Sequence, residues 1–203
     1  MSLQHTYYTI DKVSEALFKD RGSKFLAYAY PIANKDDVKK RLQNLKNQHP
    51  KAVHFCYAYR LGIDKNDFRA NDDGEPSGSA GKPILGQLDS FNLTNCLVVV
   101  VRYFGGTLLG VPGLIHAYKT STQLALEQVA IIEKEIKVTY KFTLAYENMN
   151  IIMRVIKQFQ AEIITQDMAL FCTIQVDIPY LQHEKFLQTL LELQAMNTIE
   201  LVD

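Results

Sequence analysis

Apolar residues follow two different periods along the chain. Some short segments alternate apolar and polar side chains or consist of β-branched residues, as strands do, and others repeat an apolar residue every three or four positions, as helices do. In the first two thirds of the chain this pattern predicts strands at residues 7–13, 16–20, 23–31, 53–61 and 97–101. The last of these segments is apolar throughout, which indicates a strand covered on both faces.

Helices are predicted between these strands. Asn34 is a favourable N-cap for a helix in which Val38, Leu42 and Leu45 lie on one face and which ends before Pro50. A hairpin turn is expected at residues 64–66, and two further helical segments at residues 84–91 and 114–131.

The last third of the chain has a simple order of elements. A strand at residues 136–145 is followed by a helix at 148–159, strands at 162–166 and 171–179, a helix at 181–196 and a strand at 198–202. This β-α-β-β-α-β order is typical of ferredoxin-like domains. We therefore expect an α+β protein with a first domain at residues 1–135 and a ferredoxin-like domain at residues 136–203.

Composition limits the class of protein. The chain has 47% hydrophobic and 22% charged residues, which is ordinary for a globular protein. Up to residue 135 there are 17 Lys and Arg against 14 Asp and Glu, and after it 5 against 8. This small basic excess in the first part is weaker than the charge of a protein specialised for nucleic acid.

The apolar runs of the sequence also indicate the cellular compartment and the state of the cysteines. The longest apolar run, residues 96–101, is far shorter than the roughly 20 residues that span a bilayer, and the start of the chain shows no secretory signal. Cys56, Cys96 and Cys172 are far apart, and each lies in an apolar run. We expect them to be buried free thiols in a cytoplasmic protein without a membrane segment.

The segment NDDGEPSGSAGKPIL is the first candidate for chemistry. It places Asp72, Asp73 and Glu75 around Gly74, and carboxylates this dense need compensation from a cation or from backbone N–H groups. The spacing does not match a calcium loop, so no metal site is predicted. For these acids alone, turn and cap chemistry is the favoured interpretation.

The second half of that segment is rich in small residues. Ser77, Ser79 and their glycine neighbours allow several N–H groups to converge on one anion, with Lys82 as the counter-charge. A nucleotide-binding P-loop is excluded because Pro76 and Pro83 occupy positions that need Gly and Ser or Thr. An anion cradle and a tight helix N-terminus near Pro83 both remain open.

The segment RYFGGTLLGVPGL is the second candidate. Arg102 could hold a phosphate, Tyr103 and Phe104 could stack on a base or ring, and Gly105 and Gly106 permit close backbone approach. The glycine spacing is not that of a dinucleotide-binding fingerprint. The alternative is that the aromatic residues belong to the core and the glycines form a sharp turn from strand to helix.

Together these segments closely resemble the two signature segments of the IMPACT (YigZ-like) family. RGSKFLAYAYPI (residues 21–32) and AVHFCYAYRLG (residues 52–62) support the resemblance, which covers about the first 130 residues. It implies a first domain like the second domain of ribosomal protein S5, and a second domain like a ferredoxin-like domain of elongation factors. For bacterial members it implies association with nucleic acid or the ribosome, and its eukaryotic members regulate translation.

Two functional hypotheses follow, together with a structural one. The first is a non-catalytic RNA- or ribosome-associated protein without a cofactor, whose binding residues are Asp72, Asp73, Glu75, Ser77, Ser79, Lys82, Arg102, Tyr103, Phe104, Gly105 and Gly106. The second is an enzyme or small-ligand binder that acts on an anionic, phosphorylated molecule in a cleft between the two motifs, with Asp73, Glu75 and Lys82 as catalytic groups. In the structural hypothesis, both motifs hold the ends of the strands together.

Overall fold

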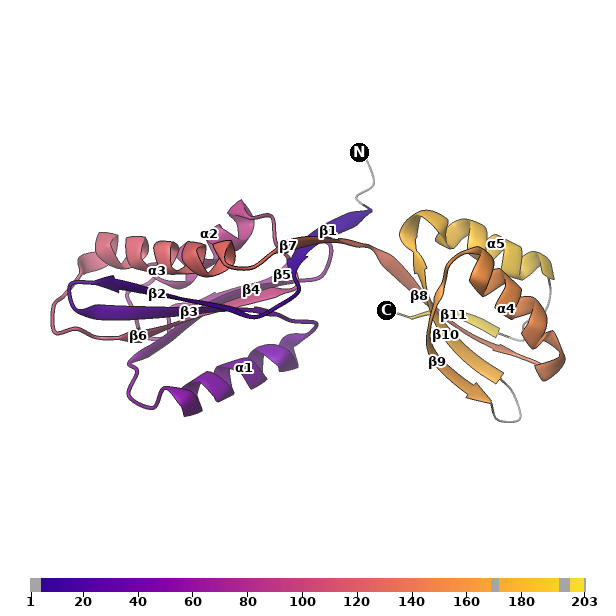
Figure 1. Ribbon diagram of the computed structural model, residues 1–203, viewed down its shortest axis with the longest axis horizontal. Coiled ribbons are helices and arrows are strands. Elements are labelled where there is room, and N and C mark those ends of the chain that lie inside the picture. Colours follow the sequence, from indigo (N-terminus) through magenta and orange to yellow (C-terminus); the bar gives the residue numbers. More distant parts are fainter. Residues whose placement is uncertain (1–4, 169–171, 194–197, 203) are drawn as a thin grey trace. The chain divides into compact units, whose positions relative to one another are not determined.

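The computed structural model describes residues 5–168, 172–193 and 198–202. The described residues form two compact units, one of residues 7–134 and one that joins residues 5 and 6 to the described residues after 134 (Figure 1). In the second unit, the N–H of Ile136 donates to the carbonyl oxygen of His5 at 2.8 Å. Residues 5 and 6 are therefore grouped with the second unit, whereas the sequence suggested a single division after residue 135.

A five-stranded antiparallel sheet forms the centre of the first unit. Its strands lie in the order β2 (Ser14–Asp20), β3 (Ser23–Pro31), β6 (Cys96–Tyr103), β4 (His54–Leu61) and β5 (Asp67–Asn71). Every residue of β6 except Tyr103 is buried, which confirms the strand covered on both faces. The edge strand β5 was not predicted, because its residues are half-buried or exposed and show no apolar alternation.

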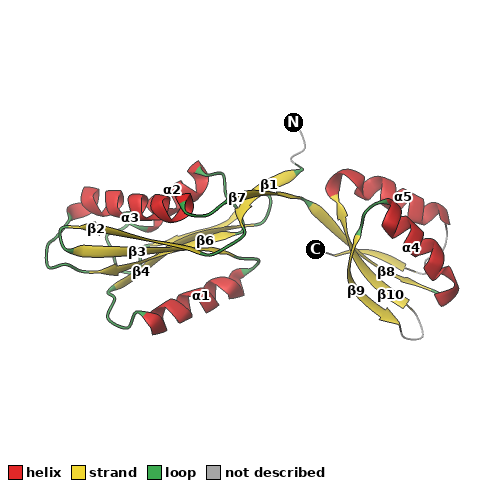
Figure 2. Ribbon diagram, viewed as in Figure 1, coloured by secondary structure: helices red, strands yellow, loops and turns green. Residues whose placement is uncertain are grey.

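Helices cover both faces of this sheet (Figure 2). They are α1 (Lys35–Gln48) on one face, and α2 (Gly81–Ser90) and α3 (Gly110–Glu127) on the other. Val98 and Val100 of β6 pack in the core beneath α2 and α3, whereas Val99 packs in the core beneath α1. Because side chains alternate along a strand, Arg102 and Tyr103 point to opposite faces of the sheet.

The ends of the helices agree in part with the sequence. The side chain of Asn34 accepts hydrogen bonds from the N–H groups of Asp36 and Asp37, which confirms the N-cap of α1. Helix α3 begins before the predicted residue 114, because Pro112 is tolerated in the first turn, where a helix has no partner for the N–H group that proline lacks. It also ends earlier than predicted, because residue 131 begins a strand.

That strand belongs to a small additional sheet. β1 (Thr6–Ile10) pairs with β7 (Ile131–Glu135) as a two-stranded sheet, and β7 was not predicted. Ile131 is apolar like the buried residues of the preceding helix, so the sequence extends the helix to it. Only the pairing of β7 with β1 shows that Ile131 is in a strand. This is a tertiary effect that local periodicity cannot show.

The second unit has the predicted ferredoxin-like topology. Its elements are β8 (Lys137–Leu144), η1 (Tyr146–Asn148), α4 (Met149–Gln158), β9 (Glu162–Met168), β10 (Cys172–Pro179), η2 (Tyr180–Gln182), α5 (His183–Leu193) and β11 (Thr198–Val202). The antiparallel sheet has the strand order β11-β8-β10-β9, and the core includes Phe142, Ile174 and Phe186. The α+β class is therefore confirmed, although residues 171 and 194–196 of the predicted elements lie outside the described part.

The cysteines also match expectation. Cys56, Cys96 and Cys172 are all free and buried. Burial raises the pKa of the Cys96 thiol from 9.0 to about 12, so this group stays protonated at neutral pH. Over the ranges that the structure describes, no helix combines the length and the apolar character needed to cross a bilayer.

Candidate functional site

The two glycine-rich motifs meet through a buried ion pair at one end of the first unit's sheet. Arg102 lies near the end of β6, on the face that α2 and α3 cover, and Glu75 lies in the loop between β5 and α2. The Nη1 atom of Arg102 is 2.5 Å from Oε1 of Glu75, and the two residues are only 5% and 9% exposed. Two charges withdrawn this far from water are stable only when each has a well-placed partner.

Further groups complete the shell of Glu75. The hydroxyl of Tyr118 donates to the same Oε1 atom at 2.8 Å, and the thiol of Cys56 lies 3.2 Å from that hydroxyl. Burial raises the pKa of Tyr118, and the nearby Cys56 and Glu75 raise it further, so the phenol stays neutral and remains a donor. His54 adds a third group, with Nε2 at 3.9 Å from Oε1.

Arg102 is enclosed by aromatic rings as well as by Glu75. Its guanidinium carbon is 5.4 Å from the ring centre of Phe25 and 5.6 Å from that of Phe104, both within cation–π range. Phe104 itself is 49% exposed. The guanidinium that the sequence predicted to hold a phosphate therefore already has a carboxylate and two aromatic rings as neighbours.

Asp72 fills the anion cradle of the first motif. Its carboxylate accepts hydrogen bonds from the N–H groups of Gly78 at 2.9 Å, Ala80 at 3.0 Å and Gly81 at 2.8 Å. Partial burial alone would raise the pKa of Asp72, but these three bonds, with Lys82 nearby, outweigh burial and lower it. The segment thus has features of both open interpretations, the anion cradle and the helix N-terminus. The N–H groups of the cradle belong to the start of α2, and the anion that they bind is the carboxylate of Asp72.

Asp73 and Ser79 are also bonded within the protein. Oδ2 of Asp73 accepts the N–H of Phe55 at 2.6 Å, and the N–H of Asp73 donates to Oδ1 of Asn71 at 2.8 Å. The hydroxyl of Ser79, which is buried, donates to the carbonyl oxygen of Pro76 at 2.6 Å. The carboxylates of the DDGE segment thus accept from the protein's own donors.

Close backbone packing adds a third segment to this end of the sheet. A Cβ atom on Gly105 would lie 2.0 Å from the carbonyl carbon of Gly22, and the N–H of Gly105 donates to the hydroxyl of Ser23 at 3.2 Å. Only two glycines permit this contact between the β2–β3 turn and the loop after β6. Gly106, one residue further along, has a left-handed φ of 86° and is exposed.

The predicted site residues are only partly brought together. Glu75, Arg102 and Phe104 meet, whereas Tyr103 lies on the α1 face, where its hydroxyl is 2.9 Å from Nδ1 of His49. Ser77 and Lys82 are exposed. The proposed binding roles of these residues remain predictions.

Several residues of the network were not predicted to belong to the site. They are Phe25, His54, Cys56 and Tyr118. Phe25, His54 and Cys56 lie in segments that carry the family resemblance, and Tyr118 lies four residues after the end of RYFGGTLLGVPGL, so the resemblance was the one available signal. Which of them touch one another depends on strand register, which the sequence does not show.

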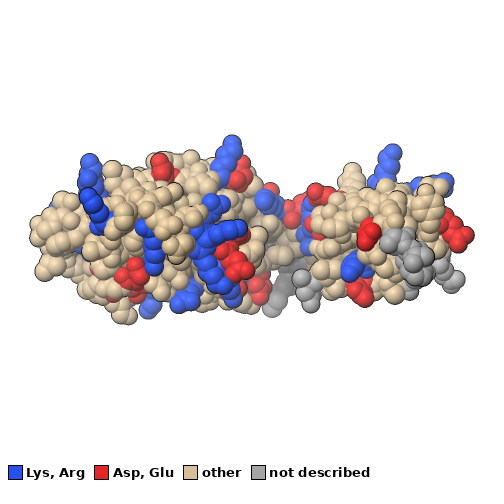
Figure 3. Space-filling view, turned by 90° about the horizontal axis from the view of Figure 1, so that it is seen from below, with Lys and Arg blue, Asp and Glu red and all other residues tan. Residues whose placement is uncertain are grey.

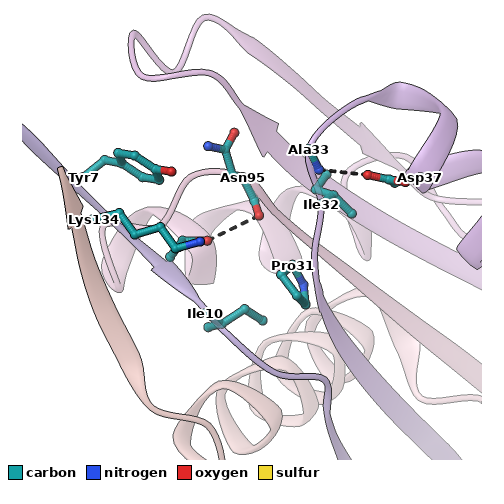
Figure 4. Close-up of a pocket in the computed structure, with 9 residues that line it drawn as sticks. Tyr7, Ile10, Pro31, Ile32, Ala33, Asp37, Asn95 and Lys134 are labelled. Atoms are coloured by element: carbon teal, nitrogen blue, oxygen red, sulfur yellow. Dashed lines mark hydrogen bonds between the residues drawn. The ribbon is translucent and has the colours of Figure 1, made fainter. Parts of the chain in front are cut away.

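A cavity of about 410 Å³ lies elsewhere in the first unit (Figure 4). It is lined by Tyr7, Thr9, Ile10, Pro31, Ile32, Ala33, Asp37, Asn95 and Lys134. None of these residues belongs to either motif. Lys134 and Asp37 give the lining mixed charge, so it does not match the purely anionic ligand that the second hypothesis requires.

Comparison with known proteins agrees with this architecture. The Impact N-terminal domain model matches residues 21–126, which contain the whole Glu75–Arg102 network. The IMPACT family member YvyE of Bacillus subtilis is 36% identical over 65% of this chain, which spans 61% of that relative. The IMPACT family member YigZ of Escherichia coli is 33% identical over 82% of this chain and 81% of its own length.

A solved structure extends the likeness to both units. The crystal structure of a hypothetical protein is 28% identical, has a TM-score of 0.77 and covers 98% of each chain. The fold defines a two-domain protein in which two glycine-rich motifs are joined by the buried Glu75–Arg102 pair. The chain belongs to the IMPACT family.

Replacing Glu75 by Gln should strongly destabilise the first unit. Arg102 would keep a buried charge without a counter-ion, and breaking a buried ion pair typically costs about 3–5 kcal/mol. The change is measured as the shift in urea-induced unfolding of the first unit. Exposed Lys82→Ala is the control and should change stability by less than about 0.5 kcal/mol. Unfolding of E75Q at the wild-type urea concentration would contradict a supporting role for the pair.

Asp72 should make stability depend on acid pH. Because the pKa of Asp72 is lower in the folded protein than its usual 3.8, its contribution is complete above that value and is lost as the pH falls through the folded pKa. Asp72→Asn should therefore be less stable than wild type at neutral pH and show a weaker loss of stability on acidification. Urea unfolding at a series of pH values measures both effects, and parallel pH profiles of the two proteins would refute them.

The glycine contact can be tested with a matched pair of substitutions. Gly105→Ala should destabilise the first unit by about 1–3 kcal/mol or more, because the new methyl group would overlap backbone atoms of Gly22. Gly86→Ala adds the same methyl group in α2, where no atom lies within 4 Å, and should stabilise by roughly 0.5–1 kcal/mol. Thermal unfolding of both variants gives the comparison, and equal shifts would show that the close contact is unimportant.

Proposed function

We propose that this chain is a non-catalytic protein that associates with RNA or the ribosome and takes part in the regulation of translation. The observation that carries the proposal is the internal bonding of Asp72, Asp73 and Glu75. With these carboxylates bonded inward, the exposed side chains that the two motifs offer a partner include Lys82 and Phe104.

A lysine and an aromatic ring suit a partner that carries both phosphates and bases. Lysine contacts phosphate as a compact point charge, and an exposed aromatic face can stack on a base without regard to sequence. Residues 7–134 contain 17 Lys and Arg against 13 Asp and Glu, so the charge of the whole unit also favours an anionic partner.

The enzymatic alternative is supported less well by the same geometry. A general base must be free to accept a proton from a substrate. Oδ2 of Asp73 accepts an N–H of the protein at 2.6 Å, and Glu75 is 9% exposed and paired with Arg102. These bonds weigh against both carboxylates as catalytic groups, whereas Lys82 fits either function.

The test is binding of the full chain to a labelled single-stranded polyuridine oligomer between about 50 and 200 mM salt. We expect the logarithm of the affinity to fall linearly with the logarithm of salt concentration. Lys82→Ala should reduce the slope by about 0.7, as expected for one phosphate contact. Phe104→Ala should weaken binding by about 1–3 kcal/mol, the contribution of one stacked base.

Lys119→Ala serves as the control, because Lys119 is exposed on α3 and lies outside both motifs. It should bind as wild type does. Absence of RNA binding by the wild-type chain at the lowest salt concentration would refute the proposed function. If K82A and F104A bind RNA as the wild type does, Lys82 and Phe104 are not part of the RNA-binding surface.

A further inference from the structure

Four exposed lysines lie on segments near Tyr103, which points to the α1 face of the first unit's sheet, opposite the Glu75–Arg102 network. Strand register places Lys19 of β2 beside Lys24 of β3, and Lys24 beside Tyr103 of β6. Neighbouring strands are about 4.8 Å apart, so this row spans about 10 Å. Lys19 and Lys24 are both exposed, whereas Tyr103 is half-buried.

Two more lysines are brought to this row by the end of α1. His49 caps α1 and bonds to the hydroxyl of Tyr103, and the N–H of Ala52 donates to the carbonyl oxygen of His49 at 3.0 Å. Lys51, which is exposed, lies within this turn. The N–H of Val53 donates to the carbonyl oxygen of the residue before Tyr103 at 3.0 Å, which fixes the turn beside β6.

Lys46 is the fourth member. Its Nζ atom is 5.9 Å from the ring centre of Phe55. Phe55 pairs in register with Val101, which lies two residues before Tyr103 and on the same face of β6. We call Lys19, Lys24, Lys46 and Lys51 the lysine patch.

The charges of the lysine patch are not neutralised by ion pairs. Within the described ranges, none of its four members has a carboxylate within ion-pair distance, and the lysines that do are Lys35, Lys39 and Lys137. Figure 3 views the first unit from the side on which α1 lies and shows lysine and arginine side chains there, with acidic side chains among them. Glu15 is the acid on the same face of β2, four residues from Lys19. The patch therefore carries a net positive charge.

The patch also contains aromatic surface. The hydroxyl of half-buried Tyr28 is 3.0 Å from Nε2 of His49, so Tyr28, His49 and Tyr103 form a bonded floor between the lysines. Such a combination of unpaired lysines and ring faces is what non-specific single-strand binding uses. An acidic peptide would need only the charges and would leave the rings without a role.

We propose that the lysine patch binds the phosphate backbone of a single-stranded RNA. This inference rests on the proposed function and names a surface for it that lies outside the first signature motif and shares only Tyr103 with the second. The lysines are exposed and lie on the opposite face from Glu75 and Arg102, so their replacement leaves the buried network intact.

The experiment compares two quadruple variants of the full chain. The patch variant is K19Q/K24Q/K46Q/K51Q, and the matched control K119Q/K141Q/K157Q/K185Q removes the same charge from exposed lysines elsewhere. Both are titrated into labelled single-stranded polyuridine, duplex RNA and polyglutamate across a salt series. Thermal unfolding confirms that both variants remain folded.

We expect the patch variant to bind single-stranded RNA about tenfold or more weakly at low salt, with a salt slope reduced by about 3, the value for four phosphate contacts. The control should keep most of the affinity and slope. If the wild type binds RNA and both variants lose the same amount, the patch is refuted while the proposed function stands. If the wild type does not bind RNA at any salt concentration, both fail.

The remaining arms identify the partner. If the wild type binds polyglutamate as tightly as RNA, and the patch variant loses this binding, the partner of the patch is an acidic protein and the inference is overturned. Tighter binding of duplex than of single-stranded RNA would overturn the single-strand assignment, because a duplex offers phosphates but no exposed base faces.

Discussion

The architecture of the first unit depends on the buried pair of Glu75 and Arg102. An arginine at the end of a central strand, 5% exposed, would be intolerable without a counter-ion, and the loop between β5 and α2 is folded so that it delivers one. Tyr118 from α3 and Phe25 from β3 complete the enclosure. One ion pair thereby joins α3 and the central strands β3 and β6 to a single loop conformation.

The rest of the acidic segment follows the same principle. Asp72 binds the N-terminus of α2 from within the loop, and Asp73 bonds to the start of β4. An acid-rich, glycine-rich sequence of this kind suggests a ligand site, but here its own carboxylates occupy the positions that an anionic ligand would take. The signature segments of the family thus describe, to a large extent, how the first unit is held together.

Element types and the second unit's topology were predictable because periodicity is local. The N-cap Asn34 and the buried run of β6 were correct for this reason. The partners of Glu75 were not predictable, because the pairing of Arg102 with Phe25 and His54 depends on register among strands far apart in sequence. The sequence grouped Arg102 with Tyr103, because the predicted strand ended at residue 101. β6 continues to Tyr103, so the two side chains point to opposite faces of the sheet.

This alternation at the end of β6 links structure and proposed function. Arg102 faces the buried network and Tyr103 faces the lysine patch, so a single peptide bond connects the two surfaces. E75Q is therefore expected to lose RNA affinity although Glu75 does not contact the RNA. The two causes differ in their salt dependence, because loss of a phosphate contact lowers the slope, whereas a reduced population of the folded unit lowers the affinity at every salt concentration. For a lysine, a change of slope is therefore the result that assigns it to the RNA-binding surface.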